Sequence, residues 1–348
     1  MADWVDLPRG WRGLALRSAE VEVVLLPGKG CDVYSWVDRR SGVDVLFKTP
    51  WGLPPAAPGA TGDSMTGWLE RYPGGWQVLC PNGGAEATAP GGVRWGFHGE
   101  ACLVPWEVVD TGPGWAELTV RLHRAPLRLR RRITLAGPLL TIDESVTNTS
   151  PDELELMWSH HPAFGAPFLG PDCVLATSAR TLVADDEAPG TLLAAGSTHP
   201  WPLVSTKDGA ALDLSVLPPA PAAQLAYLTD LDEGWFAITN TRLGFGVGMR
   251  WPTEVFGHAW FWQELSSSPG YPWWREAYVC AVEPASTIPG QGVDAARGKG
   301  SGLLRLAGGQ RRDVRVEAVL FPATGKVCRI GPGGLVETET QAGEPEGA

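Results

Sequence analysis

Two histidine segments carry the side chains of this sequence that are best suited to proton transfer. His98 lies in Gly-Phe-His-Gly-Glu at residues 96–100, and His160 and His161 lie together in Trp-Ser-His-His-Pro at residues 158–162. Because imidazole titrates near neutral pH, each could donate or accept a proton at a substrate. Adjacent residues of an extended chain point in opposite directions, so we expect at most one of the paired histidines to enter a given pocket. A structural hydrogen-bonding role remains open for each of them.

A third candidate is Glu283, which follows a mostly apolar segment at residues 278–282 and precedes Pro284. A buried carboxylate is costly unless it is paired or functional, so a glutamate at the end of an apolar strand could act as a base. The alternative is a solvated loop residue.

Other chemistries lack their sequence signatures. The histidines have neither the HxxxH nor the HxH spacing that would define a metal site, so we expect no metal. The GxSxG motif of many serine hydrolases does not occur. Residues 81–84, Pro-Asn-Gly-Gly, lack the lysine and the following helix of a phosphate-binding loop.

The chain contains 17 Trp, several of them beside Pro and Gly and outside periodic runs. Aromatic side chains in loops suit sugar recognition, because the apolar face of a sugar ring packs against an indole. The alternative is that they pack the loops themselves. These residues are Trp51, Trp68, Trp76, Trp95, Trp260, Trp262, Trp273 and Trp274.

Charge and composition exclude several classes of partner. The formal net charge of −11 disfavours nucleic acids and anionic membrane surfaces. The N-terminal segment has no apolar region of a signal peptide, and no run reaches the roughly 18 apolar residues of a membrane span. The six cysteines form no CxxC pair, which indicates buried free thiols. We expect a cytoplasmic protein, monomeric or homodimeric, that binds a small molecule.

The elements that must position these residues are strands. The 44 Gly and 31 Pro disfavour a helical bundle, and alternating apolar residues predict strands with one buried face. Residues 31–37 and 43–47 flank a polar turn and predict a hairpin. We expect an all-β sandwich or barrel. Further strands are expected at residues 21–26, 115–122, 127–135, 139–146, 154–158, 211–216, 224–228, 235–239, 244–250, 260–262, 278–282, 302–306 and 313–320.

Two segments, residues 49–75 and 184–202, have the composition of long loops, which are often functional in a compact domain. The best helix candidate is the short segment 293–297. We expect a single domain over residues 1–336, followed by an acidic, disordered tail at residues 337–348.

In their order along the chain, several segments resemble a divergent subgroup of the aldose 1-epimerase (galactose mutarotase-like) superfamily. The segments are the strand at 23–27, the hairpin end at 44–47, Gly-Trp-Gln-Val-Leu-Cys-Pro-Asn-Gly-Gly at 75–84, Phe-His-Gly-Glu at 97–100, His-Pro-Ala-Phe at 161–164 and Val-Glu-Pro at 282–284. The resemblance covers residues 20–320. It implies a large antiparallel β-sandwich with an open cleft on one sheet.

The resemblance also implies an activity, the interconversion of sugar anomers without a metal or cofactor. By motif position, Glu283 would remove the proton of the anomeric hydroxyl, His161 would protonate the ring oxygen, and His98 would hold the substrate. Indoles would hold the apolar face of the sugar, and amides would bind its hydroxyl groups. The candidates for these two roles are Trp76, Trp260, Trp262, Asn82, Gln77 and Gln263.

Two departures leave the substrate open. The arginine of the family's Asn-Arg-Ile element is missing, because residues 81–86 read Pro-Asn-Gly-Gly-Ala-Glu, and the family's substrate-binding aspartate has no clear counterpart besides Asp230 or Asp232. One alternative is therefore a catalytically inactive carbohydrate-binding protein on the same fold. Another is a sugar isomerase or lyase that uses the same acid and base on a carbon-bound proton.

Overall fold

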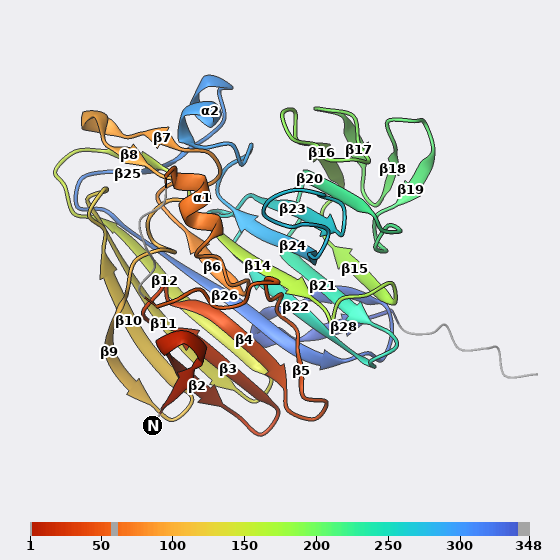
Figure 1. Ribbon diagram of the computed structural model, residues 1–348, viewed down its shortest axis with the longest axis horizontal. Coiled ribbons are helices and arrows are strands. Elements are labelled where there is room, and N and C mark those ends of the chain that lie inside the picture. Colours follow the sequence, from red (N-terminus) through yellow and green to blue (C-terminus); the bar gives the residue numbers. More distant parts are fainter. Residues whose placement is uncertain (1, 57–61, 340–348) are drawn as a thin grey trace, which may run out of the picture.

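Alternating burial along the strands organises this chain into two large antiparallel sheets, which the computed structural model describes over residues 2–56 and 62–339 (Figure 1). The twelve-stranded sheet contains, in spatial order, β1 (Asp3–Leu7), β2 (Trp11–Arg17), β3 (Val21–Leu26), β4 (Asp32–Asp38), β6 (Trp76–Leu79), β14 (Ser159–Gly165), β24 (Tyr278–Ala285), β23 (His258–Leu265), β20 (Ala222–Thr229), β16 (Thr181–Ala184) and β17 (Thr198–Pro200), with β5 (Val43–Asp44) beside β4.

The eight-stranded sheet packs against one face of the larger sheet. In spatial order it contains β15 (Cys173–Thr177), β21 (Gly234–Asn240), β22 (Phe245–Trp251), β26 (Arg311–Pro322), β12 (Leu139–Asn148), β11 (Leu127–Ala136), β10 (Trp115–Arg121) and β9 (Glu107–Gly112). Two-stranded sheets are formed by β7 (Ala87–Thr88) with β8 (Arg94–Trp95), β13 (Leu154–Leu156) with β25 (Leu304–Leu306), β18 (Leu203–Ser205) with β19 (Ala211–Asp213), and β27 (Val327–Ile330) with β28 (Val336–Thr338).

The helices are short. They are α1 (Ser64–Leu69) and α2 (Val293–Gly298), together with single 3-10 turns at Pro8–Gly10, Pro90–Gly92 and Pro332–Gly334. The predicted helix at 293–297 is therefore confirmed, whereas α1 lies in a segment predicted to be a loop. It begins there because Asp63 caps it by accepting a hydrogen bond from the Thr66 amide at 2.8 Å. In the described part of the chain, neither helix has the length and hydrophobicity needed to cross a membrane.

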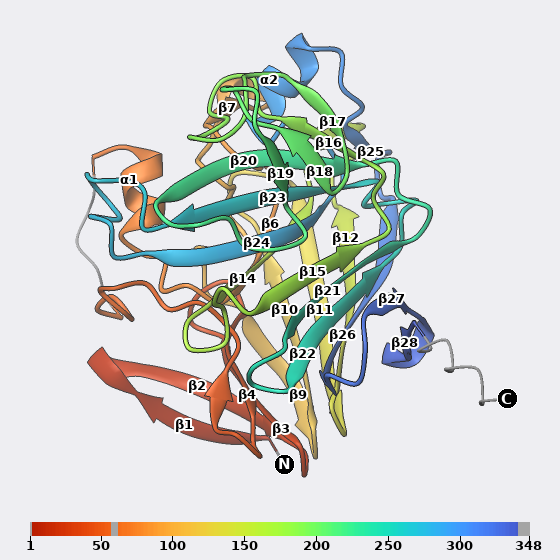
Figure 2. The ribbon, with the colours of Figure 1, turned by 90° about the vertical axis from the view of Figure 1, so that its right-hand side faces the viewer.

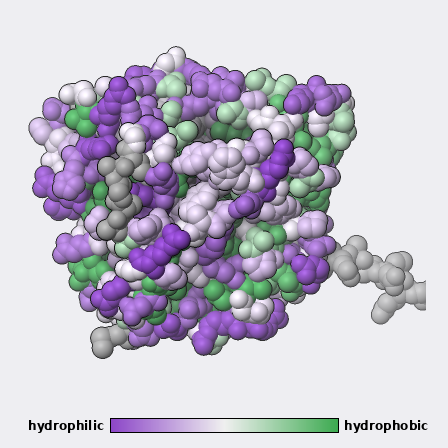
Figure 3. Space-filling model, viewed as in Figure 1, coloured by the Kyte–Doolittle hydropathy of each residue, from purple (hydrophilic) through white to green (hydrophobic). Residues whose placement is uncertain are grey.

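The main core lies between the two sheets, as Figure 2 shows, with β14 and β24 on one side and β11, β12 and β26 on the other. Phe164 of β14 packs across this interface on Phe236 of β21, with ring centroids 5.8 Å apart. The predicted all-β antiparallel sandwich is confirmed. Helix α1 lies on the opposite side of β14 and β24 (Figure 2), and we call this face of the twelve-stranded sheet its outer face. The surface on this side mixes hydrophilic and hydrophobic residues without a large continuous hydrophobic area (Figure 3).

One arginine of β11 occupies a buried position of the alternating strand, where an apolar residue is expected. Arg128, Arg130 and Arg132 are exposed, but Arg131 is fully buried between the sheets. Its guanidinium pairs with Glu144 of β12 at 2.5 Å, and Glu144 also accepts a hydrogen bond from the Trp158 indole at 2.7 Å. The buried charge is tolerated because it is paired and hydrogen-bonded.

All six cysteines are free thiols, and five of them are buried. The exposed one is Cys328 in β27.

The ends of the predicted segments differ from expectation. β28 pairs with β27 and includes Glu337 and Thr338, so strand structure continues into the first two residues of the predicted tail. The rest of that tail, residues 340–348, lies outside the described residues, as do residues 57–61 of the predicted loop at 49–75.

Candidate active site

The two adjacent histidines of β14 point to opposite faces of the twelve-stranded sheet, as predicted. His160 faces the core, where its Nδ1 accepts a hydrogen bond from the Trp76 indole at 3.1 Å. His161 faces outward and lies opposite Gln77 of β6 in the strand register. This separation follows from the period of two in an extended chain.

A row of side chains crosses the outer face around His161. It consists of Gln77 on β6, His161 on β14, Glu283 on β24, Trp260 on β23 and Tyr227 on β20, and we call it the central row. Trp260 is paired with Glu283 in the β23–β24 register, and Tyr227 with Trp260 in the β20–β23 register. In the β14–β24 register Ser159 pairs with Ala285 and Ala163 with Ala281, and His161 and Glu283 lie midway between these pairs. Because directly paired residues share a face of a sheet, five strands bring these side chains together.

His161 and Glu283 form the centre of the row. Nε2 of His161 lies 3.7 Å from Oε1 of Glu283, and the two side chains are 5% and 2% exposed. Nδ1 of His161 and Oε2 of Glu283 are buried and have no hydrogen-bond partner in the structure. A buried polar atom without a partner costs free energy, so these two atoms call for an explanation.

Burial sets the protonation of this pair. It raises the pKa of Glu283 well above its ordinary value and lowers the pKa of His161 to about 4. Both shifts have the same cause, because each charged form loses its hydration. The two groups together hold one proton over a wide pH range.

His98 lies beside the pair on a constrained turn. Its φ of 58° is left-handed, and its backbone and ring are both tied to Gly84: the His98 amide donates to the Gly84 carbonyl at 3.0 Å, and the Gly84 amide donates to His98 Nδ1 at 3.1 Å. Burial lowers the pKa of His98 well below its ordinary value. The neutral ring therefore carries its proton on Nε2, where it can donate to a ligand. The His98 and His161 rings are 5.8 Å apart.

Two further aromatic residues lie beside the histidines: Trp68, one of the loop tryptophans considered for sugar recognition, and Tyr72, which sequence reasoning missed. Trp68 in α1 stacks on Tyr72, with centroids 4.6 Å apart, and Tyr72 lies 5.6 Å from the His161 ring. The Tyr72 hydroxyl and the Trp68 indole nitrogen are buried without a partner. The only sequence signal for Tyr72 was its place in the long segment 49–75, whose path no periodicity defines.

The predicted indoles occupy different places. Trp262 is half-buried on the outer face, 5.8 Å from His161. Trp260 is covered, because its ring packs against Gly83 and Gly290 and its nitrogen donates to the Thr287 carbonyl at 2.9 Å. Trp76 lies in the core against His160. Of these three indoles, only Trp262 is both next to His161 and partly exposed, so only it could contact a ligand on the outer face.

Of the three amide side chains predicted to bind the substrate, only Gln77 lies in the central row. Nε2 of Gln77 donates to Asp32 at 2.9 Å, while its Oε1 is buried and unpartnered. Asp32 is itself held by the buried Lys29 at 2.5 Å. Gln77 therefore presents an acceptor.

The other two amides are used structurally. Asn82 donates to the carbonyls of Ala85 and Gly96 at 2.7 and 3.1 Å and accepts from the Val293 amide at 2.9 Å, so its groups are all engaged with backbone. Gln263 lies on the core face, where it accepts from Gln224 at 2.7 Å. Neither amide has a free group at the central row.

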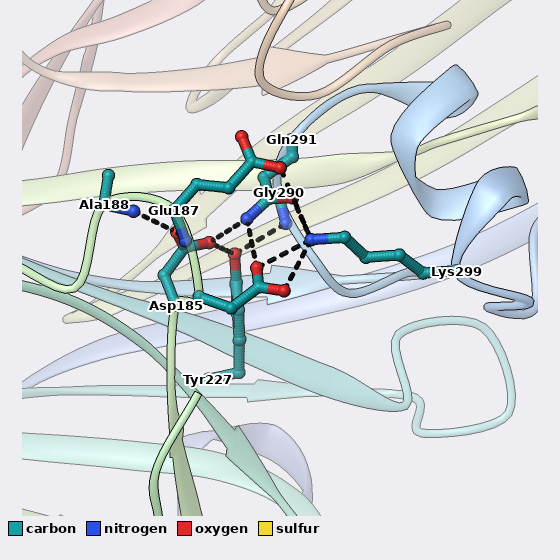
Figure 4. Close-up of polar contacts among 8 residues, drawn as sticks. Asp185, Glu187, Ala188, Tyr227, Gly290, Gln291 and Lys299 are labelled. Atoms are coloured by element: carbon teal, nitrogen blue, oxygen red, sulfur yellow. Dashed lines mark hydrogen bonds and ion pairs between the residues drawn. The ribbon is translucent and has the colours of Figure 1, made fainter. Parts of the chain in front are cut away.

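A polar cluster closes the far end of the central row (Figure 4). The Tyr227 hydroxyl donates to the buried Asp185 and accepts from the Gly290 amide at 2.9 Å. Gln291 donates to Asp185 and Asp186 at 2.7 and 2.8 Å, and Lys299, just after α2, pairs with Asp186 at 2.7 Å. This cluster fixes the loop that carries Gly290 against Trp260.

The acids expected as alternatives lie elsewhere, and no metal geometry is present in the described part of the chain. On the exposed surface, Asp230 accepts a hydrogen bond from the Thr181 hydroxyl, and Asp232 forms an ion pair with Arg180. Over residues 2–56 and 62–339, no group of three or more His, Cys, Asp or Glu side chains has an arrangement that could hold a metal ion.

Comparisons with known proteins agree with the architecture. A family model described as "Domain of unknown function (DUF4432)" matches residues 8–320. No curated protein matches the sequence.

Several solved structures share the fold at low identity. The Slr1438 protein from Synechocystis sp. PCC 6803 is 17% identical with a TM-score of 0.67, covering 92% of this chain and 100% of its own. A candidate aldose 1-epimerase from Escherichia coli K12 is 16% identical with a TM-score of 0.64, covering 88% and 98%. A galactose mutarotase-like protein from Clostridium acetobutylicum is 14% identical with a TM-score of 0.65, covering 92% and 98%. The chain therefore has the all-β galactose mutarotase-like fold.

Proposed function

The chain belongs to the DUF4432 family of domains of unknown function, and we propose that it is an aldose 1-epimerase that interconverts the anomers of a sugar. One observation carries the proposal. On the outer face of a galactose mutarotase-like sandwich, His161 and Glu283 lie 3.7 Å apart, buried, each with one polar atom that has no partner among the described residues. This is the geometry that a pair needs to exchange protons with two oxygens of one small ligand.

In the proposed reaction, Glu283 removes the proton of the anomeric hydroxyl while His161 donates a proton to the ring oxygen. The bond between the anomeric carbon and the ring oxygen breaks, and the hydroxyl oxygen becomes the carbonyl oxygen of an open-chain aldehyde. Rotation about the adjacent carbon–carbon bond exposes the other carbonyl face. Closure reverses both proton transfers and returns the enzyme to its starting state, so no oxidant, reductant or cofactor is consumed.

The shifted pKa values fit one proton shared by the pair. In the free enzyme burial favours a neutral carboxyl and a neutral imidazole, which together carry the same proton as a carboxylate and an imidazolium. A sugar that donates its anomeric hydroxyl to Glu283 and accepts at its ring oxygen from His161 stabilises the charged pair through two charge-assisted hydrogen bonds. Substrate binding thereby creates the reactive protonation state.

Other groups around the pair supply binding. The Nε2–H of His98 is a donor, Oε1 of Gln77 is an acceptor, and the half-buried Trp262 offers an aromatic face. We propose that these three hold the remaining hydroxyls and the apolar face of the ring.

The experiment that tests the proposal is NMR exchange spectroscopy of anomeric protons on a panel of neutral, uronic and sulfonated sugars. Exchange faster than in buffer, and lost in Glu283→Gln, supports an epimerase. Binding without acceleration on any sugar would instead support a carbohydrate-binding protein.

A second candidate, a sugar isomerase or lyase, is favoured by the raised pKa of Glu283, since a carboxylate of higher pKa is a stronger base toward a carbon-bound proton. The same spectra recorded in D2O separate the two. Ring opening leaves every carbon-bound proton in place, whereas an isomerase or lyase introduces deuterium at carbon or yields a new product.

A further inference from the structure

A chain of aromatic rings leads from His161 to the surface. Trp262 lies 5.8 Å from His161, Trp273 lies 5.7 Å from Trp262, and Trp51 stacks on Trp273 at 5.6 Å with an interplanar angle of 22°. His161 and Trp273 are buried, Trp262 and Trp51 are partly exposed, and Trp51 lines a surface pocket.

The pocket has a volume of about 230 Å³, and it is lined by Trp51, Leu69, Glu70, Tyr271, Pro272 and Trp274. Trp274 is 60% exposed and Tyr271 is 51% exposed, which is unusual for such large aromatic side chains. Leu69 and Glu70 directly follow Trp68, whose ring packs on His98 and His161. The end of α1 therefore contributes to both places: Leu69 and Glu70 line the pocket, and Trp68 packs beside His161.

The loop that carries these exposed rings is held in place. Trp274 and Arg275 have φ values of 50° and 63°, a left-handed conformation that costs a non-glycine residue free energy. Their amides donate to the carbonyls of Gly270 and Ser268 at 2.9 and 2.8 Å.

A buried carboxylate anchors the start of the same loop. Glu264, two residues after Trp262 in β23, accepts hydrogen bonds from the amides of Ser267 and Ser268 at 2.6 and 3.0 Å and from the Ser268 hydroxyl at 2.6 Å. A strained, anchored display of exposed aromatic rings is typical of a ligand site.

We propose that Trp51, Tyr271 and Trp274 form an outer aromatic subsite for the second ring of a reducing disaccharide, whose reducing-end ring occupies the site of His161 and Glu283. The inference rests on the proposed function and names its substrate class. The aromatic faces suit the apolar face of a sugar ring, and the Glu70 carboxylate at the rim can accept from a hydroxyl.

The test uses the full chain with maltose, cellobiose, lactose and melibiose and with their component monosaccharides. Anomer exchange gives kcat/KM, and saturation-transfer difference NMR gives binding without requiring turnover. We expect at least one disaccharide to be preferred over its monosaccharides. Trp274→Ala should lower kcat/KM and affinity for that disaccharide by roughly tenfold more than for the monosaccharide, the size of one aromatic contact. The control is Trp4→Ala, an exposed tryptophan on β1.

The outcomes separate this inference from the proposed function. Disaccharide binding that Trp274→Ala weakens, without exchange of any sugar, would retain the subsite and reject the epimerase. Exchange of monosaccharides with no disaccharide preference, or an equal effect of Trp274→Ala on both sugar classes, would reject the subsite and retain the epimerase. Binding of no disaccharide at all would also overturn the subsite.

Discussion

His160 and His161 are consecutive residues of β14, yet one imidazole accepts a hydrogen bond from Trp76 in the core and the other lies 3.7 Å from Glu283 on the outer face. Two identical side chains thus occupy chemically different environments one residue apart. Substitution of each therefore separates packing from chemistry.

We predict opposite effects for the two histidines. His161→Asn should lower kcat by about 10²–10⁴-fold, the usual contribution of a general acid, with little change in thermal stability. His160→Asn should leave kcat nearly unchanged but lower the free energy of unfolding by about 1–3 kcal/mol, because the buried Trp76 indole loses its acceptor. Anomer exchange and denaturant unfolding measure the two quantities. The reverse ranking would show that the core histidine, and not His161, serves the reaction.

Glu283→Gln should abolish anomer exchange while the protein keeps its fold and binds sugar. The raised pKa of Glu283 means that the carboxyl costs free energy when ionised, so the neutral amide should give an unfolding temperature equal to or above that of the wild type. Exchange NMR, saturation-transfer difference NMR and thermal unfolding test the three parts. Turnover retained in this variant would remove Glu283 from the role of base.

The pH dependence follows from the single proton of the pair. The active enzyme gains a second, inhibitory proton as pH falls through the pKa of His161 near 4, and it loses the required proton as pH rises through the raised pKa of Glu283. We therefore expect kcat/KM to fall below about pH 4 and to fall again only well above the ordinary carboxyl pKa of about 4.3. An alkaline limb close to that ordinary value would contradict the burial of Glu283.

Tyr72→Phe removes a buried hydroxyl that has no hydrogen-bond partner within residues 2–56 and 62–339. If the hydroxyl contacts the sugar, kcat/KM should fall by about tenfold or more, the value of one hydrogen bond to a ligand. The free energy of unfolding should stay equal or rise by about 1 kcal/mol, because an unsatisfied polar group leaves the core. Steady-state exchange and urea unfolding on the same preparation test both. A loss of stability without a loss of activity would assign Tyr72 to packing alone.

Tyr227→Phe should loosen the loop that carries Gly290. The substitution removes the hydrogen bond to Asp185 and leaves the Gly290 amide without its acceptor. We expect KM to rise more than kcat falls, and the amides of residues 290–292 to exchange with solvent faster. Tyr278→Phe on β24, a half-buried tyrosine, is the matched control. Equal behaviour of the two variants would show that the cluster in Figure 4 does not position the site.

Sequence reasoning predicted the parts of the site that strand periodicity and motif order define. The sandwich and the opposite orientations of His160 and His161 were predicted and are observed. The prediction placed both Trp76 and Gln77 at the substrate, although neighbours on a strand face opposite sides, and the structure leaves only Gln77 on the outer face.

The same parity separates Trp262 from Gln263, which lies on the core face. Trp68, Tyr72 and Asp185 could not be placed from the sequence for a different reason. They lie in or beside irregular segments, whose path depends on caps and long-range hydrogen bonds such as those of Asp63 and Gln291.

The burial of five thiols gives this protein a built-in chemical reporter. Burial raises the pKa of Cys31, Cys102 and Cys280 to about 12, so these groups are unreactive thiols while the sheets stay packed. A maleimide added to the native protein should modify Cys328 alone, which places a single fluorophore on β27. The labelling rates of the five buried cysteines, measured by mass spectrometry, then report how often the surrounding part of the sandwich opens.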